Sequence, residues 1–348
     1  MNEIFISPNN LARLADVVFA ETVDTKVFQN SNNINKKVVN ISKNKESEFI
    51  TYKLNKFTLK ENDLIYCHTE FIDELFMLLK SEKNLKNIKL ITHQSDKTLT
   101  SKQIKKKPEC ISNWLSLNLG IVSENVEPIP FGLSNKMSQK NLSQIEEIPK
   151  ELNLENKEDK LYLNFQKNTN RDERENLYEY FSKDDWAVIK DPNLSLDVYK
   201  KDLINFTFIL CPWGNGYDTN RLWEALYFGC IVITKKHPTF SNLNDLPIIQ
   251  VDSYYDIDLQ FLKESKKNIK NKIINYDKLR ALWWINYIKE NKVSGNKSVV
   301  EIKQNLIFSL LYIIKWRTIN MIESKNKKLV YFFYRLKKYL ARSNNNEL

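Results

Sequence analysis

Half of the six glycines of this 348-residue chain fall in one short window, residues 206–234 (FTFILCPWGNGYDTNRLWEALYFGCIVIT). Glycine permits tight turns and close backbone approach, so this window should contain a tightly built loop. Residues 206–210 and 230–234 are apolar runs typical of strands, and apolar positions recur between them at helical spacing. Asp218 is predicted to cap that helix and Gly229 to end it. The result is a βαβ unit of a parallel sheet, in which ligands bind beyond the carboxyl ends of the strands.

The loop of this unit has the composition of an anion site. Gly214 and Gly216 are expected to leave backbone N–H groups uncovered, in front of a helix N-terminus that carries about half a positive charge. Arg221 can add a bidentate contact to a phosphate, and Glu224 lies on the same helix face. A carboxylate there can accept hydrogen bonds from sugar hydroxyls. The alternative interpretation is a surface ion pair between Arg221 and Glu224, with glycines that only serve a turn.

The same window resembles the signature of exostosin-like glycosyltransferases, the family 47 type, in which it forms the donor half of a GT-B fold. Eleven positions match the pattern: Pro212, Gly214, Gly216, Asp218, Arg221, Glu224, Ala225, Leu226, Gly229, Cys230 and Ile231. The family's usual proline after the isoleucine is Val232 here. Two looser matches, residues 161–174 and 113–135, extend the resemblance to about half of the chain.

The resemblance implies two Rossmann-like parallel-sheet domains that face each other across a cleft. It also implies inverting transfer of a sugar from a nucleotide-sugar, expected to be UDP-linked, to a hydroxyl of a glycan or lipid-linked glycan. Surface polysaccharide or lipopolysaccharide synthesis is the expected setting. No cofactor beyond the donor is expected, and the need for a divalent metal is left open. The DxD triplet at residues 256–258 is interpreted as a loop, so no metal site is predicted.

The length of the chain favours two domains, and the first half alternates predicted strands and helices. We expect strands at residues 4–6, 64–67 and 88–92, and helices at 11–19 and 69–81. The predicted organisation is an acceptor-side domain at 1–138, a linker at 139–158, the donor domain at 159–297 and a C-terminal extension at 298–348.

Candidate site residues follow from the predicted strand ends. All three histidines come just after strands. His93 is the preferred acceptor-side catalytic residue, because Asp96 follows closely and could serve as the base or orient the histidine. The alternative is that these histidines only hydrogen-bond a turn. The predicted donor-binding residues lie in two strand-to-helix loops of the second half: Asn168, Thr169, Arg171, Arg174, Gly214, Asn215, Gly216, Asp218, Arg221 and Glu224. Arginine is the planar phosphate binder, which is why Arg171 and Arg174 are included.

The C-terminal segment combines an apolar helix pattern with a basic tail. Ser298 and Glu301 form a predicted capping box for a helix at 298–316, whose apolar stretch is shorter than the about 20 residues that a bilayer requires. Residues 315–348 contain nine basic and two acidic residues. We expect the helix to dock on the domains and the tail to contact an anionic membrane surface.

The cysteines and the N-terminus indicate a cytoplasmic protein, with peripheral contact on the inner face of the membrane. Four cysteines without metal spacing are typical of reduced thiols, and MNEIFISPNN lacks the features of a signal peptide. Two other classes stay open. A catalytically silent glycan- or nucleic-acid-binding protein would explain the basic tail, although no specific nucleic acid is expected. A nucleotide-dependent oxidoreductase is disfavoured because no GxGxxG motif follows the first strand of either half.

Overall fold

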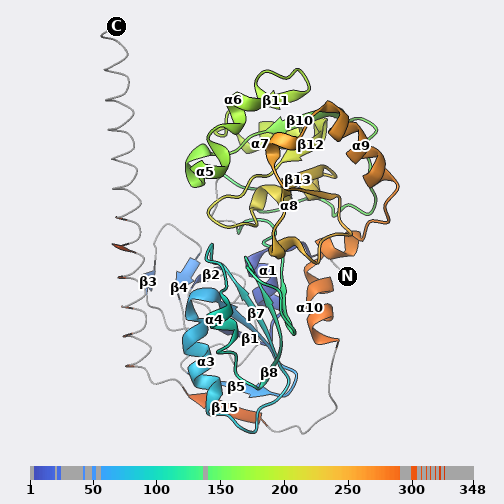
Figure 1. Ribbon diagram of the computed structural model, residues 1–348. Helices are drawn as coiled ribbons and strands as arrows, with labels where there is room; N and C mark the ends of the chain where they lie inside the picture. Colours follow the sequence, from blue (N-terminus) through green and yellow to red (C-terminus); the bar gives the residue numbers. More distant parts are fainter. Residues whose placement is uncertain are drawn as a thin grey trace, which may run out of the picture. The chain divides into compact units, whose positions relative to one another are not determined.

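The computed structural model describes residues 4–19, 22–24, 42–43, 49–51, 56–135, 140–290, 299–303, 307, 311, 314, 318, 321, 322 and 325. The chain forms two compact units, Met1–Ile302 and Lys303–Leu348. Both large sheets belong to the first unit (Figure 1). A small antiparallel sheet in this unit has the order β2 (Thr22–Asp24), β4 (Phe49–Thr51), β3 (Ser42–Lys43).

The first large sheet is parallel throughout and has the order β1-β6-β7-β8-β9. Its strands are β1 (Val17–Phe19), β6 (Leu64–His68), β7 (Ile88–His93), β8 (Ile111–Ser116) and β9 (Val126–Pro128). Among its described residues, this half has the helices α1 (Pro8–Leu14), α3 (Ile72–Lys80) and α4 (Ser101–Ile104). The strands expected at 64–67 and 88–92 and the helix expected at 69–81 are confirmed, the last with a 3₁₀ turn at Thr69–Phe71 before α3.

The predictions for the first twenty residues are wrong in detail. Residues 4–6 form no sheet strand, and only Phe5 makes an isolated bridge, to Arg280. The helix begins earlier than expected because the Ser7 side chain accepts a hydrogen bond from the Asn10 N–H and Pro8 occupies the first turn. It ends at Leu14, and β1 then pairs in parallel with β6. A run of Val and Phe favours a strand once a sheet edge is available to it.

The second large sheet is also parallel and has the order β11-β10-β12-β13-β14. Its strands are β10 (Glu158–Leu163), β11 (Ala187–Ile189), β12 (Phe206–Leu210), β13 (Ile231–Lys235) and β14 (Ile248–Val251). Its helices are α5 (Arg171–Arg174), α6 (Leu177–Phe181), α7 (Leu196–Asn205), α8 (Asn220–Tyr227) and α9 (Leu259–Lys270). The sequence window 206–234 is therefore the βαβ unit β12-α8-β13, as predicted.

The two ends of α8 differ in how well the sequence predicted them. Gly229 follows the last turn with φ +67°, a conformation that side chains with a Cβ rarely adopt, so its role in ending the helix is confirmed. The capping role predicted for Asp218 is wrong. The N-cap residue is Thr219, which makes no side-chain cap hydrogen bond. The Asp218 carboxylate is instead used by a more distant part of the chain, as described below.

The last helix of the first unit, α10 (Ala281–Lys289), joins the second half to the first. Its first residue donates a backbone hydrogen bond to the Ile4 carbonyl, 2.8 Å away. The Tyr287 hydroxyl donates to Glu127 at 2.6 Å, and Lys289 pairs with Asp16 at 2.8 Å. A helix that follows the second sheet in sequence thus packs on residues of the first half.

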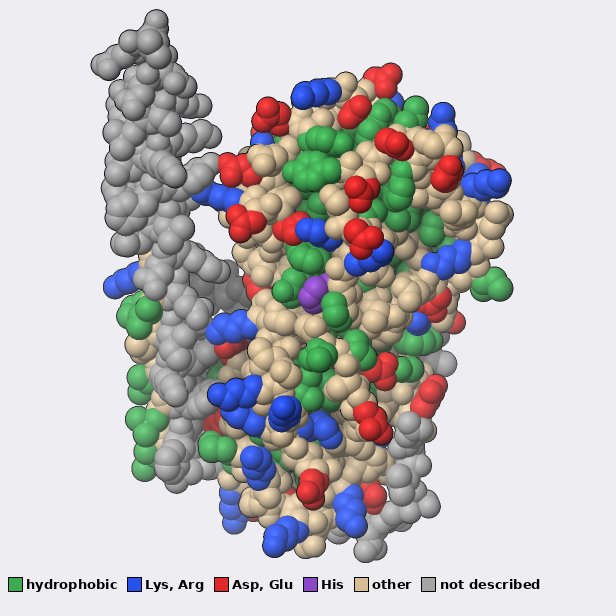
Figure 2. All heavy atoms as spheres, in the orientation of Figure 1, with side chains coloured by type: hydrophobic (Ala, Val, Ile, Leu, Met, Phe, Trp, Pro, Cys, Tyr) green, Lys and Arg blue, Asp and Glu red, His purple; other side chains and the backbone are tan. Residues whose placement is uncertain are grey.

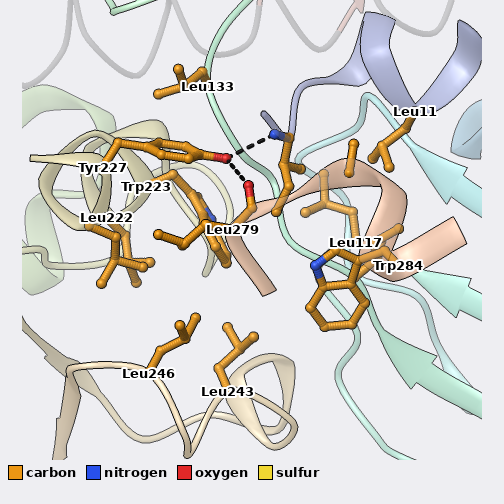
Figure 3. Close-up of a cluster of buried hydrophobic side chains, with 14 of the residues drawn as sticks. Leu11, Leu117, Leu133, Leu222, Trp223, Tyr227, Leu243, Leu246, Leu279 and Trp284 are labelled. Atoms are coloured by element: carbon orange, nitrogen blue, oxygen red, sulfur yellow. Dashed lines mark hydrogen bonds between the residues drawn. The ribbon is translucent and has the colours of Figure 1, made fainter. Parts of the chain in front are cut away.

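One hydrophobic core runs through both halves. It includes Val18, Leu64 and Ile91 of the first sheet and Tyr162 and Ile209 of the second. Figure 3 shows Tyr227 of α8 within this cluster: its hydroxyl accepts from the Ile6 N–H at 2.8 Å and donates to the Leu279 carbonyl at 2.7 Å. A second cluster, with Leu161, Phe208 and Ile231, is confined to the second half. The halves therefore share much of their core.

The helix start predicted at Ser298 and Glu301 is wrong at Glu301, because residues 299–303 form a strand, while Ser298 lies outside the described residues. β15 (Val299–Lys303) pairs with β5 (Lys56–Lys60) of the first half. Valine and isoleucine at alternate positions favour this extended pairing over a helix. Residues 307, 311, 314, 318, 321, 322 and 325 are helical. Among the described residues, no helix is long and apolar enough to cross a membrane. Most of the basic tail at 315–348 lies outside the described residues.

Candidate functional site

The carboxyl ends of the two parallel sheets meet at Asn118, two residues after β8. Its Oδ1 accepts hydrogen bonds from the backbone N–H groups of Tyr217, at 3.0 Å, and Asp218, at 3.1 Å. Its Nδ2 donates to the Ser95 carbonyl at 3.1 Å. Asn118 is fully buried and adopts φ 50°, a conformation that asparagine tolerates better than most residues. The CPWGNGYD loop after β12 is therefore held by the first half of the chain.

Gly216 is required for this contact. A Cβ at this position would lie 2.5 Å from Asn118 Nδ2, closer than real Cβ atoms approach. Gly214 instead forms the internal turn of the loop, because its N–H donates to the Gly216 carbonyl at 2.9 Å. The expectation of an uncovered N–H at Gly214 is thus wrong. The glycines shape the loop and seat Asn118, and Asn215 is exposed between them.

Arg174 lies beneath this loop and holds it to the preceding strand-to-helix turn. Its Nε donates to the Trp213 carbonyl and its Nη2 to the Pro212 carbonyl, each at 2.7 Å. Its Nη1 donates to the Gln166 carbonyl at 3.0 Å and to the Thr169 hydroxyl. The side chain is buried, and all four contacts are to neutral oxygen atoms. Within the described part of the chain, Arg174 has no carboxylate partner.

Arg221 is the second residue of α8, and its hydrogen bonds to the described residues all come from Nη1. Its Nη1 donates to Asn164 Oδ1 at 3.1 Å and to the Tyr199 hydroxyl at 3.3 Å, and the guanidinium lies over the Tyr199 ring at 5.3 Å. Among the described residues, nothing accepts a hydrogen bond from its Nε or Nη2. The side chain is partly exposed. Arg221 therefore has donors left for a ligand.

Glu224 is buried and contacts protein. One carboxylate oxygen accepts from the Leu142 N–H at 2.8 Å and the other from the Tyr199 hydroxyl at 2.9 Å. Burial raises the pKa of Glu224, against the opposite effect of the nearby Arg221 charge. The surface ion pair considered as an alternative is excluded, since Glu224 is buried. Tyr199 links the two residues, because it donates to Glu224 and receives a bond from Arg221.

The two arginines repel each other. Burial and, to a smaller extent, the charge of Arg221 lower the pKa of Arg174 to about 10. Burial would also lower the pKa of Arg221, but Tyr199 and Glu224 outweigh it and raise that pKa. Both residues stay cationic at neutral pH. A concentration of positive charge at the end of a parallel sheet favours an anion.

The other predicted donor-binding residues lie around these arginines. Asn168 and Thr169 are exposed in the 3₁₀ turn Lys167–Thr169, and Arg171 is partly exposed at the start of α5. Asp218 is buried, accepts from the Phe131 N–H at 2.7 Å and accepts from Trp223 Nε1. Burial raises the pKa of Asp218 to about 7, against these hydrogen bonds. Asp218 therefore links the two halves from inside the protein.

An aromatic group beside the loop was missed by sequence reasoning. The rings of Tyr217 and His237 stack with centroids 3.5 Å apart, and Trp213 meets both edge-on at 4.8 and 5.3 Å. Lys235 lies over the Trp213 ring at 5.3 Å and pairs with Glu173 at 2.8 Å. The three aromatic side chains are partly exposed. The only signal in the sequence was the position of each residue just beyond a strand.

All three histidines use Nδ1 to bind the turn that follows them. His68, His93 and His237 accept from the backbone N–H groups of Glu70, Gln94 and Thr239. Burial lowers the pKa of each to about 4. His93 is also fully buried, and its Nε2 donates to the Pro130 carbonyl at 3.0 Å. With both nitrogens bound to protein, His93 has no position from which to take a proton, so its predicted role as a base gains no support.

Asp96 is exposed. The residues on either side of it, Ser95 and Lys97, both bind the carboxylate of Glu70. Glu70 Oε1 accepts from the Ser95 hydroxyl, and Glu70 Oε2 pairs with Lys97, each at 3.0 Å. Glu70 follows β6 and Asp96 follows β7, so both lie at the carboxyl end of the first sheet. Asp96 is thus presented by an ordered loop, which sequence reasoning did not predict.

Other chemistry is limited in the described residues. No group of three or more His, Cys, Asp or Glu side chains among them could hold a metal ion. All four cysteines are buried and unpaired with one another. Neither a scan against protein-family models nor a search of curated proteins finds a match to this chain. The function must therefore be inferred from the residues of the site and from the resemblance of their sequence pattern.

Proposed function

We propose that this protein is a glycosyltransferase of GT-B type that transfers a sugar from a nucleotide-sugar to a hydroxyl of a glycan. The observation that carries the proposal is Arg221, a partly exposed cation with two unoccupied donor atoms among the described residues, next to the buried Arg174. In such a transfer, the leaving nucleoside diphosphate gains negative charge. Fixed donors aimed at that charge stabilise the transition state.

The structure suggests different roles for the residues that resemble the family signature. We assign the direct diphosphate contact to Arg221. Arg174 acts as a positioning residue, because its hydrogen bonds hold the backbone of the loop. Glu224 also acts through another group, since it orients Tyr199 beneath the Arg221 guanidinium. The stacked Tyr217 and His237 rings offer an aromatic edge for the base or sugar of the donor.

On the acceptor side, we propose Asp96 as the proton acceptor in an inverting reaction. It is the exposed carboxylate of the loop that Glu70 fixes, whereas His93 is sealed inside the sheet. The Asp96→Asn variant should lose at least about 100-fold in kcat while its donor affinity stays unchanged. Loss of donor affinity without loss of kcat would exclude this role.

The first experiment is thermal unfolding of the full chain with UDP-, GDP-, CMP- and dTDP-sugars. A donor at about 100 times its dissociation constant should stabilise the native state by about 2.7 kcal/mol, which is visible as a higher melting temperature. We expect a shift with a UDP-sugar that is lost in Arg221→Ala, partly retained in Arg221→Lys and unchanged in Arg13→Ala. Arg13 is exposed on α1 and serves as the control.

The result also separates the proposal from its alternative. No shift with any nucleotide-sugar, in a protein that binds glycans through its aromatic edge, would indicate a glycan-binding protein without activity. If Arg221→Ala unfolds, Arg221→Lys still tests the site, because it keeps the charge and loses the planar geometry.

A further inference from the structure

The second half of the molecule contains a hollow whose lining includes none of the proposed site residues. Its volume is about 430 Å³, and it lies between α9 and the strands β10 and β12. Four lysines of α9 line it: Lys263, Lys266, Lys267 and Lys270. Their spacing places them on adjacent turns of one helix side. We call this feature the α9 hollow.

The floor of the α9 hollow is apolar. It consists of Phe208 and Leu262, which are buried, and Leu259, whose exposed fraction is 38%. Just beyond the end of α9, Ile273 is 92% exposed, the highest value among the large hydrophobic residues that the structure describes. Transfer of so exposed an isoleucine side chain from water into an apolar phase is favourable.

The lysines of the α9 hollow carry positive charge that the protein does not neutralise. Lys266 pairs with Asp159, which also accepts from the Thr207 hydroxyl at 2.9 Å. Lys263, Lys267 and Lys270 have no ion pair or side-chain hydrogen bond within the described part of the chain. The one acid of α9, Glu264, accepts from Gln260 at 2.6 Å. The hollow thus offers three unpaired cations around an apolar floor.

A second lysine-lined hollow in the first half provides the contrast. It lies between the end of α3 and residues 105–110, which follow α4, and six lysines line it. We call it the α3–α4 hollow. Figure 2 shows Lys and Arg side chains gathered over the region where Figure 1 draws α3 and α4. The leucines that line this hollow, Leu79 and Leu85, are buried. It therefore combines positive charge with no exposed apolar lining.

We propose that the α9 hollow and Ile273 form a docking surface for an anionic phospholipid membrane. The lysines bind the phosphate headgroups, while Ile273 and Leu259 enter the boundary between headgroups and acyl chains. This surface is distinct from residues 315–348, and it does not depend on the glycosyltransferase proposal. Charge alone would favour the α3–α4 hollow, whereas an exposed apolar side chain, Leu259, lines only the α9 hollow of these two.

The test uses a fluorophore whose emission reports on its surroundings. The full chain with Ile273→Cys is labelled with a nitrobenzoxadiazole group, and the four native cysteines are buried and react slowly. The matched control is Met77→Cys on α3, where Met77 is 63% exposed. Vesicles of phosphatidylcholine mixed with phosphatidylglycerol should shift the emission of the label at 273 to the blue. The label at 77 should not respond, and vesicles of pure phosphatidylcholine should affect neither.

Charge removal completes the test. Replacing Lys263, Lys266, Lys267 and Lys270 by Ser in the labelled Ile273→Cys protein should weaken vesicle affinity at least about tenfold. The control variant replaces Lys80, Lys83, Lys86 and Lys105 by Ser, which removes the same charge from the α3–α4 hollow. It should leave the vesicle-induced blue shift of the label at position 273 unchanged. Equal responses at positions 273 and 77, silence at 273, or equal loss in both lysine variants would each overturn the proposal.

Discussion

The carboxyl ends of the two parallel sheets differ in the charged and titratable side chains that they carry. At the first sheet, the buried His93 and the partly buried His68 are neutral, because each binds a following backbone N–H and desolvation lowers its pKa to about 4. At the second sheet, Arg174 and Arg221 stay charged although they repel each other. An edge with excess positive charge suits an anionic ligand. The first edge instead exposes the Asp96 carboxylate, which suits a hydroxyl-bearing ligand.

The largest expected effect concerns Arg174, a buried cation at the carboxyl end of the second sheet, and its contribution to stability. Arg174→Ala should lower the free energy of unfolding by about 3 kcal/mol, because it removes a buried side chain that donates to three carbonyl groups of two loops. Chemical denaturation measures this loss. Arg13→Ala on the surface should change stability by less than about 0.5 kcal/mol. A small effect at Arg174 would mean that the loop is held by other contacts.

A second prediction concerns the link between the two edges. Gly216→Ala should destabilise the protein by about 1–3 kcal/mol, because the added Cβ overlaps Asn118 Nδ2. In the double variant with Asn118→Ala, the overlap disappears, so the two losses should not add. Denaturation of the single and double variants gives the coupling free energy. Simple additivity would show that Gly216 matters for another reason.

The smallest expected effect is the pH dependence that the buried His93 of the first sheet gives to stability. A histidine with a native pKa of about 4 binds its proton more readily when unfolded, so its contribution to stability is present above about pH 6.5 and is lost as the pH falls towards 4. His93→Gln removes that dependence. Between pH 7.5 and 5, the stability of the wild type should fall by about 1–2 kcal/mol relative to this variant. Parallel pH profiles would mean that His93 titrates normally in the fold.

Much of the architecture was predictable because local patterns specify it. The window 206–234 combines apolar β-forming runs, helical periodicity and a terminal glycine, and it forms β12, α8 and β13 as expected. Patterns failed where two local signals competed. Residues 17–19 continue a helical pattern yet pair with β6, and residues 299–303 resemble a capped helix start yet pair with β5.

The candidate site was predictable in composition and less so in geometry. Two of the predicted arginines, Arg174 and Arg221, lie close enough for their charges to repel each other. The orientation of each side chain depends on partners far away in sequence. Asp218, just before α8, binds Phe131 of the first half as well as Trp223 of the helix, and Glu224 binds Leu142. The aromatic edge of Tyr217 and His237 joins two loops that no sequence spacing connects.

By itself, the sequence determined the parallel α/β class and the position of the glycine-rich loop, because both follow from periodicity and backbone freedom within short segments. Only the tertiary structure decided which polar groups are available to a ligand. That choice depends on burial and on hydrogen-bond partners more than fifty residues away, such as Asn164 for Arg221 and Asn118 for the loop. A polar side chain becomes functional or structural according to whether the fold has already satisfied it.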